Sequence, residues 1–183
     1  MKPSPLQPNQ TYHIYNRGNN RENLFREKRN YHHFLKLYTR YIAPITATYA
    51  YCLMPNHFHL LIKIKSHASN PSQSFSNLFN AYTKAINHAY GRTGSLFETP
   101  FHRIPVTDTP YFWNLIRYIH QNPQHHRFVD DFRDWPYSSY KALITPDQPT
   151  KIAKDALIDW FGDRQSIIHA HLDMVDLDLN FDP

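Results

Sequence analysis

The sequence predicts an α+β fold, in which helices pack on one face of an antiparallel sheet as they do in ferredoxin-like and RRM-like domains. Three observations support this prediction. Segments with strand and helix periodicity follow one another in the order β-α-β-β-α-β-α. Two of the strands flank the tight turn Pro55-Asn56 and would form a hairpin. Hydrophobic residues make up 41% of the 183 residues, enough for a core.

The first half of the chain supplies three of the expected strands and one helix. Aromatic and β-branched residues alternate from Thr11 to Asn16, which predicts a strand. Apolar residues at helical spacing predict a helix from Asn30 to Ile42, and Pro44 follows as its stop. Ile45 to Met54 and His57 to Lys65 are the two strands of the hairpin.

The second half begins with a helix predicted from Phe75 to Tyr90. The next strand, Phe101 to Val106, contains Pro105, and this predicts an edge position in the sheet. A further helix is expected from Pro110 to Asn122. It should end near Asn122, because Pro123 disfavours helical geometry in the residue before it. Beyond it, DWPYSSYKALI predicts a turn and a short helix.

Charge divides the chain into two parts, a domain at residues 1–145 and an acidic C-terminal extension at residues 146–183. The extension contains eight aspartates and three basic residues, whereas residues 1–145 contain 17 basic and seven acidic residues. The net charge of +5 is therefore the sum of a strongly basic part and an acidic one. A basic surface of this size favours a polyanionic partner, most simply a nucleic acid.

Cysteine content and hydropathy restrict the cellular setting. Cys52 is the single cysteine, which excludes a disulfide framework and favours a reducing compartment. No apolar stretch is long enough to span a bilayer, and MKPSPLQPNQ at the N-terminus has no apolar leader core. We therefore expect a cytoplasmic protein without a membrane partner.

Two histidines stand two residues apart on the second strand of the hairpin. His57 and His59 would share one face with Leu61, while Phe58 and its alternate neighbours form the core face. Two imidazoles can bind a metal ion, and they are too few for a closed structural site, so an open catalytic site is one interpretation. Two surface histidines held by hydrogen bonds are the other. Leu61 stands where a histidine-triad enzyme would have a third histidine, and one cysteine is too few for a zinc deaminase.

Tyr118 is the candidate nucleophile on the helix from Pro110 to Asn122. It lies beside the apolar stripe of that helix, with Asn114 one turn before it and Asn122 one turn after it. None of the other tyrosines in predicted helices has a polar residue one turn later. A packed aromatic side chain with one hydrogen bond is the alternative interpretation of Tyr118.

Five spaced motifs together resemble a known family. They are YHIYNRGN, NHFHLLI, GRTGSLF, IRYIHQNP and DWPYSS, and they extend from Thr11 to Leu143. The set resembles the HUH single-strand DNA transposases that use one tyrosine, of the insertion-sequence-200-like superfamily. Within that superfamily the likeness is greatest to the REP-associated tyrosine transposases.

The resemblance implies a site and a reaction. It implies that His57, His59 and Asn122 bind a divalent metal, Mg²⁺ or Mn²⁺, and that Tyr118 attacks a DNA phosphate to form a 5′-phosphotyrosine. It also implies that residues 1–145 are the catalytic domain, that the substrate is single-stranded DNA with a hairpin, and that the protein is a monomer or a homodimer. The candidate DNA-contacting residues are Arg17, Arg21, Lys63, Lys65, Arg92 and Arg103.

Three functions follow as hypotheses. The first is a metal-dependent transposase that nicks and rejoins DNA, in which Lys63, Lys65 or Arg117 helps to activate the tyrosine. The second is a hairpin nucleic-acid-binding protein that has kept the fold without cutting. The third is a metal-dependent phosphohydrolase that uses water and forms no covalent adduct.

Overall fold

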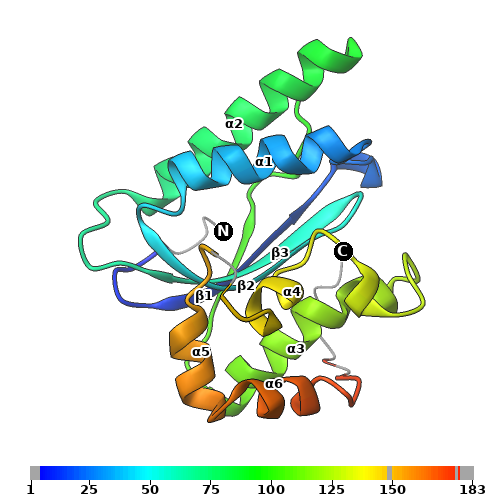
Figure 1. Ribbon diagram of the computed structural model, residues 1–183. Helices are drawn as coiled ribbons and strands as arrows, with labels where there is room; N and C mark the ends of the chain where they lie inside the picture. The colour runs from blue at the N-terminus through cyan, green and yellow to red at the C-terminus, as the bar shows by residue number, and fades with distance from the viewer. Residues whose placement is uncertain (1–4, 148–149, 176, 178–183) are drawn as a thin grey trace.

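A computed structural model of the chain describes residues 5–147, 150–175 and 177 (Figure 1). The elements follow the predicted order through the first seven, and three short helices and two 3₁₀ turns complete them. The elements are β1 (Thr11–Arg17), η1 (Asn19–Arg21), α1 (Lys28–Tyr41), β2 (Thr46–Leu53), β3 (His57–Ile64), α2 (Pro71–Tyr90), β4 (His102–Pro105), α3 (Thr109–His125), η2 (Phe132–Asp134), α4 (Tyr140–Ile144), α5 (Lys154–Phe161) and α6 (Arg164–Ala170).

The four strands form one sheet in the order β2-β3-β1-β4. Each neighbouring pair is antiparallel, and the central pair aligns Tyr15 with His59 and Arg17 with His57. This order is the one expected of a ferredoxin-like β-α-β-β-α-β unit, so the predicted fold class is confirmed. β4 lies at an edge, as Pro105 in the sequence predicted.

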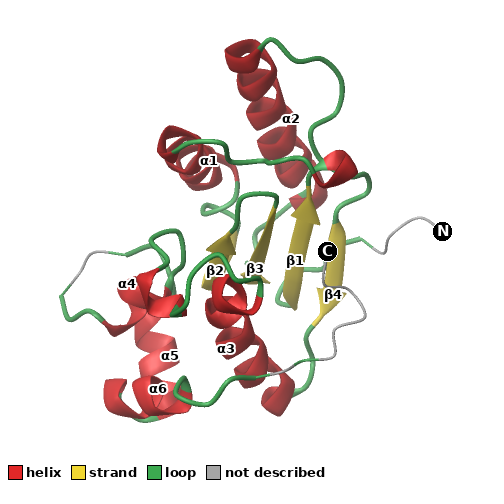
Figure 2. Ribbon diagram, turned by 90° about the vertical axis from the view of Figure 1, so that its right-hand side faces the viewer, coloured by secondary structure: helices red, strands yellow, loops and turns green. Residues whose placement is uncertain are grey.

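Helices cover both faces of the sheet, which corrects the prediction that they pack on one face. Figure 2 shows α1 and α2 on one side of the strands and α3 with the later helices on the other. α3 carries its own apolar stripe, including Leu115 and Ile119, which is fully buried against Cys52 and Leu61 of the sheet. Since a helix with such a stripe must bury it, the second face could not stay open.

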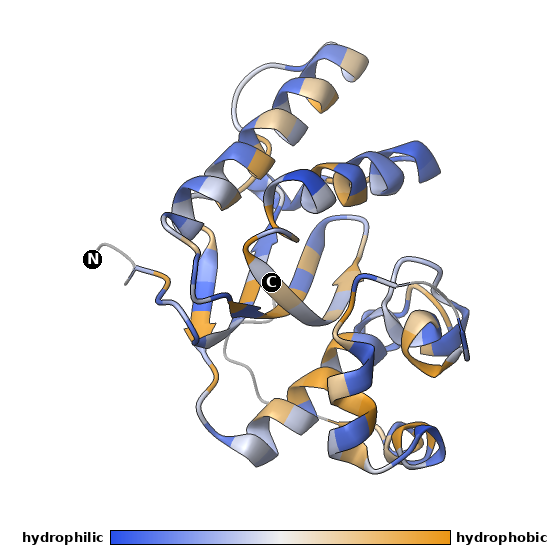
Figure 3. Ribbon diagram, turned by 60° about the vertical axis from the view of Figure 1, so that its left-hand side comes forward, coloured by the Kyte–Doolittle hydropathy of each residue, from blue (hydrophilic) through white to orange (hydrophobic). Residues whose placement is uncertain are grey.

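The alternation in β3 explains the two cores. Phe58, Leu60 and Ile62 belong to the core under α1 and α2, while Leu61 belongs to the core under α3. Hydrophobic and hydrophilic positions also alternate along α1 and α2, so that each helix buries one face (Figure 3). The side chains of His57 and His59 therefore lie on the α3 side, on the face opposite to Phe58, as the sequence predicted.

Two helix boundaries differ from the prediction. α2 begins one turn earlier than predicted, because Asn70 caps it by accepting a 3.1 Å hydrogen bond from the amide of Gln73. α3 continues past Pro123 to His125. Pro123 lies in the last turn of the helix, where its missing N–H removes only one backbone hydrogen bond. The amide of His126 still donates to the carbonyl of Asn122.

Part of the acidic C-terminal extension packs on the core under α3. Leu157 of α5 and Ile167 of α6 are fully buried there, and Ile152 forms a β-bridge with Thr48. The division at residue 146 remains a prediction, but the extension and α3 share one core. Among the described residues, no helix is both long enough and apolar enough to cross a membrane.

Candidate active site on the second face of the sheet

The two histidines of β3 lie in the interior, between the sheet and α3. His57 and His59 are each 1% exposed, and their rings meet edge to face with centroids 5.3 Å apart. Their strand is central, with β2 and β1 hydrogen-bonded on either side. The backbone that carries them is therefore held on both sides.

α3 brings the predicted tyrosine and asparagine to these histidines. Oδ1 of Asn122 lies 3.4 Å from Nε2 of His57. The ring of Tyr118 meets that of His59 edge-on, with centroids 5.9 Å apart. Residues four apart on a helix share one face, so a single helix delivers both side chains. The four residues predicted from widely separated motifs thus form one cluster.

The hydrogen bond of His57 fixes which of its nitrogens faces Asn122. Nδ1 of His57 lies 2.8 Å from Oδ1 of Asn56, and an amide oxygen only accepts, so Nδ1–H donates. When the neutral ring carries its proton on Nδ1, Nε2 has a lone pair, and Oδ1 of Asn122 lies 3.4 Å from it. A cation between a nitrogen lone pair and an amide oxygen would be bound by both.

His59 also fits a metal ligand. Its Nε2 is buried and has no hydrogen-bond partner among the described residues. Burial lowers the pKa of His59 well below its usual value, and His13, His57 and His126 lower it further. A neutral imidazole is the form that binds metals.

The donor set of a metal site here would be two imidazoles and one amide oxygen. Within the described part of the chain, no three His, Cys, Asp or Glu side chains are grouped to hold an ion. The third protein ligand would therefore be the amide oxygen of Asn122. Such an open set suits Mg²⁺ or Mn²⁺ with further positions for water and substrate, and the residues present fit that group.

Sequence reasoning missed several members of this cluster. His13 of β1 lies 2.9 Å from His59, between Nε2 of the first ring and Nδ1 of the second. The rings of His125 and His126 lie 5.8 Å from Tyr118 and 4.7 Å from His57, respectively. The alternation of His13 and Tyr15 in the first predicted strand was the available signal, but strand pairing was needed to place them.

The cations proposed to assist Tyr118 are engaged elsewhere. Lys65 donates from Nζ to the carbonyl oxygens of Ala43 and Pro44. Arg117 donates to the carbonyl of Asp173. Lys63 lines a cavity with Trp160 near the start of α3. The rings of His59 and His125 both lie near that of Tyr118, with centroids 5.9 and 5.8 Å away.

The six predicted DNA-contacting residues divide into separate groups. Arg17 pairs with Glu98 at 2.6 Å, Arg92 pairs with Glu22, and the exposed Arg21 lies in the adjoining loop. The segment after Arg17, which contains Arg21, and the segment after Arg92 meet through a β-bridge from Gly18 to Phe97, at the end of the sheet where Arg17 aligns with His57. The other three lie elsewhere, Lys63 and Lys65 toward the opposite end of β3 and Arg103 against the ring of Phe101. Contact with DNA remains a prediction for all six.

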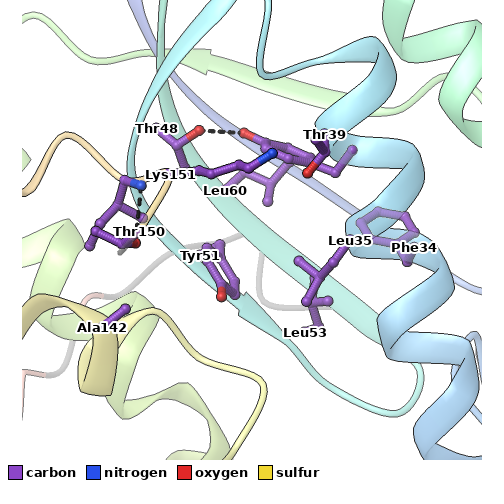
Figure 4. Close-up of a pocket in the computed structure, with 12 residues that line it drawn as sticks. Phe34, Leu35, Thr39, Thr48, Tyr51, Leu53, Leu60, Ala142, Thr150 and Lys151 are labelled. Atoms are coloured by element: carbon purple, nitrogen blue, oxygen red, sulfur yellow. Dashed lines mark hydrogen bonds between the residues drawn. The ribbon is translucent and has the colours of Figure 1, made fainter. Parts of the chain in front are cut away.

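A large cavity lies apart from this cluster. It measures about 410 Å³ and is lined by residues of α1, β2, β3 and α4 and by Thr150 to Ile152 (Figure 4). Its walls are mostly apolar, with Phe34, Tyr51 and Leu60 among them. None of the histidines of the cluster lines it.

Comparisons with known proteins show that the chain is similar to transposases. A profile of the family described as "Transposase IS200 like" matches residues 7–122. A Haemophilus influenzae protein whose name assigns it to the REP-associated tyrosine transposases is 28% identical over 113 residues, 55% of this chain and 64% of that protein. The REP-associated tyrosine transposase of Escherichia coli is 24% identical over 115 residues, 62% of each chain. The chain thus spans less than two thirds of the length of both relatives.

A solved structure supports the fold. It is that of a REP-associated tyrosine transposase bound to a REP hairpin, and it is 17% identical with a TM-score of 0.65. The match covers 82% of this chain and 88% of that one. At this identity the likeness shows the fold alone. The matched family region contains β1 to β4 and ends at Asn122, so it includes all four clustered residues. The chain belongs to the family of IS200-like transposases.

Proposed function

We propose that this protein is a single-strand DNA transposase that cuts and rejoins DNA through a covalent bond to Tyr118. One observation carries the proposal: α3 places Tyr118 beside His59 and Asn122 beside His57, in one buried cluster. A nucleophile next to residues fitted to hold a divalent cation is the arrangement that phosphoryl transfer requires.

We further propose that the substrate is single-stranded DNA that carries a hairpin. A structural relative was solved with a REP hairpin, and residues 1–145 are strongly basic. The loops with Arg17, Arg21 and Arg92 lie at the end of the sheet nearest His57, where a phosphate backbone approaching the cluster would meet them.

The reaction is an in-line displacement at phosphorus. The phenolic oxygen of Tyr118 loses its proton and forms a bond to the phosphorus, while the bond from phosphorus to the 3′ oxygen breaks. The 3′ oxygen takes up a proton and leaves as a hydroxyl, and the 5′ end stays on the tyrosine. A 3′-OH can reverse the step and join strands without ATP. A divalent ion bound by His57, His59 and Asn122 would neutralise charge on the phosphate.

The residues of the chain have distinct parts in this reaction. Tyr118 supplies the nucleophile, and its edge contact with His59 sets the position of the ring. Burial lowers the pKa of His59, which favours the neutral imidazole whose lone pair a cation can bind. Tyr118 is only 3% exposed, so the fold shields the nucleophile from solvent water.

A gel experiment tests the covalent step. The full chain is incubated with end-labelled hairpin-bearing single-stranded DNA and Mn²⁺, then separated under denaturing conditions. We expect a labelled band that survives denaturation and is lost in Tyr118→Phe, which keeps the ring and removes the nucleophilic oxygen. Tyr111→Phe, a change of the same kind on the half-buried part of the same helix, is the matched control and keeps the band.

The other hypotheses predict different results. Binding of the hairpin without cleavage, in the presence of either Mg²⁺ or Mn²⁺, would favour a binding protein derived from a transposase. Cleavage without an adduct, undiminished in Tyr118→Phe, would favour a hydrolase that uses water.

A further inference from the structure

We propose that His13 is a positioning residue that holds the ring of His59 in the tautomer whose Nε2 can bind a metal ion. The inference rests on the proposed function, since it concerns the same metal site. His13 lies on β1, outside the hairpin that carries the two histidines. None of the sequence motifs discussed above assigns a role to its side chain.

The contact between the two rings is specific. Nε2 of His13 lies 2.9 Å from Nδ1 of His59, the rings are stacked at 20°, and the two residues are 0% and 1% exposed. The antiparallel register sets this contact, because Tyr15 aligns with His59 and His13 lies one pair further along, on the same face. Water does not compete for a bond at this depth, so the two rings determine each other's proton positions.

The direction of the hydrogen bond decides what His59 can do. A neutral imidazole carries one N–H. When Nδ1–H of His59 donates to His13, Nε2 of His59 carries a lone pair; when His13 donates, the proton of His59 is on Nε2. This Nε2 is buried without a hydrogen-bond partner among the described residues. In the first case a cation can bind the lone pair of His59, whereas in the second Nε2 carries a proton and cannot bind one.

His57 shows the same arrangement with a different partner. Its Nδ1–H donates to Oδ1 of Asn56, so its Nε2 faces Asn122. Histidine ligands of metals commonly donate their other N–H to an acceptor, which fixes the tautomer and the ring orientation. Asn56 supplies that acceptor from the hairpin turn, and the ring nitrogen of His13 supplies it from the neighbouring strand.

Titration calorimetry with Mn²⁺ tests the assignment without reference to activity. His13→Leu removes the acceptor and keeps a buried side chain, and we expect Mn²⁺ to bind about tenfold to a hundredfold more weakly. His13→Gln restores an acceptor and should recover most of the affinity. His102→Leu is the matched control, because His102 lies on the neighbouring strand, is exposed and stacks on Tyr15 rather than on His59. It should leave the affinity unchanged.

A second readout reports the tautomer itself. Long-range ¹H–¹⁵N spectra of the metal-free protein should show His59 protonated on Nδ1, and a shift toward Nε2 in His13→Leu.

Unchanged affinity and tautomer in a folded His13→Leu variant would overturn the positioning role while leaving the metal site in place. Equal losses of Mn²⁺ affinity in His13→Leu and His13→Gln would indicate that His13 acts by packing alone, and would also overturn the positioning role. Failure of the wild-type chain to bind Mn²⁺ would overturn both the metal site and the role of His13, whereas a covalent adduct missing despite Mn²⁺ binding would count against the proposed function alone.

Discussion

Two groups of buried histidines lie on opposite sides of α3, and their ring nitrogens are satisfied to different degrees. Behind the helix, His120 bonds through Nδ1 to His171 and through Nε2 to Ser139, and Nδ1 of His171 bonds to the carbonyl of Ile167. In front of it, Nε2 of His59 has no hydrogen-bond partner among the described residues. In the first group every ring nitrogen has a hydrogen-bond partner, whereas in the second Nε2 of His59 can accept a ligand.

Burial and pKa do not separate the two groups. His59 and His120 are 1% and 0% exposed, and burial lowers the pKa of both well below the usual value. The two groups differ in the hydrogen bonds of their ring nitrogens. A histidine whose two ring nitrogens are both hydrogen-bonded links parts of the fold, while a ring nitrogen without a hydrogen bond can bind a ligand. The comparison therefore favours a structural role for His120 and His171, and it supports the proposed metal binding at His59.

The largest expected effect comes from removing one histidine from each group. His59→Ala should reduce adduct formation and Mn²⁺ binding to background, because a ligand with no substitute is lost. His120→Ala should lower the free energy of unfolding by at least about 2 kcal/mol, because it leaves buried partners unsatisfied, while the folded protein still binds Mn²⁺. Urea denaturation and calorimetry on both variants measure the two effects. Retained Mn²⁺ binding in His59→Ala would contradict the assignment.

The sequence could predict the group with His57 and His59 but not the group with His120 and His171. Strand alternation put His57 and His59 on one face, and helix spacing put Asn122 one turn after Tyr118, each within one segment. Their shared role was implied by the resemblance to the transposase family. His120 and His171 meet across 51 residues, and their contact depends on how α6 packs against α3. That packing depends on buried side chains such as Leu157 and Ile167, and no local period shows which surface they will meet.

The same limit explains the error about the faces of the sheet. Alternation in β3 predicted two faces, and the polar one was expected to be open. The apolar stripe of α3 was visible in the sequence, but the sequence does not say which face a helix after the fourth strand will cover. Cys52, Leu61 and Met54 supplied the apolar surface that received it. The histidines were consequently buried rather than displayed.

The group behind the helix should make the protein sensitive to acid. Burial, with a smaller contribution from the charge of Arg117, lowers the pKa of His171 to about 4. The unfolded chain then binds more protons than the folded one between pH 6.5 and pH 4, so stability is complete above this range and falls as the pH falls through it. The shift corresponds to about 3 kcal/mol.

Chemical denaturation at pH 7.0 and pH 4.5 measures this loss. The informative quantity is the difference between the wild type and His171→Leu, because it isolates this imidazole from the rest of the chain. The variant should lose less stability on acidification, because it has no imidazole to charge at this position. An equal loss in both proteins would show that His171 is not the group that limits stability in acid.

The smallest expected effect concerns Ser139, which joins the group behind the helix to the edge of the sheet. Its hydroxyl lies 2.8 Å from Nε2 of His120 and accepts a hydrogen bond from the amide of Tyr51 at 2.9 Å. Ser139→Ala removes these two contacts and a 3.3 Å contact with the carbonyl of Tyr51, and should cost about 1–2 kcal/mol of unfolding free energy, with Mn²⁺ affinity and adduct yield unchanged. Urea denaturation and calorimetry on the same sample measure both quantities.

Ser138→Ala is the control for the general cost of losing a hydroxyl here, because Ser138 is a buried neighbour whose hydroxyl accepts a hydrogen bond from the amide of Tyr140. A fall in Mn²⁺ affinity in Ser139→Ala alone would mean that the two histidine groups are coupled through α3, and the division between a structural group and a ligand-binding one would then have to be given up.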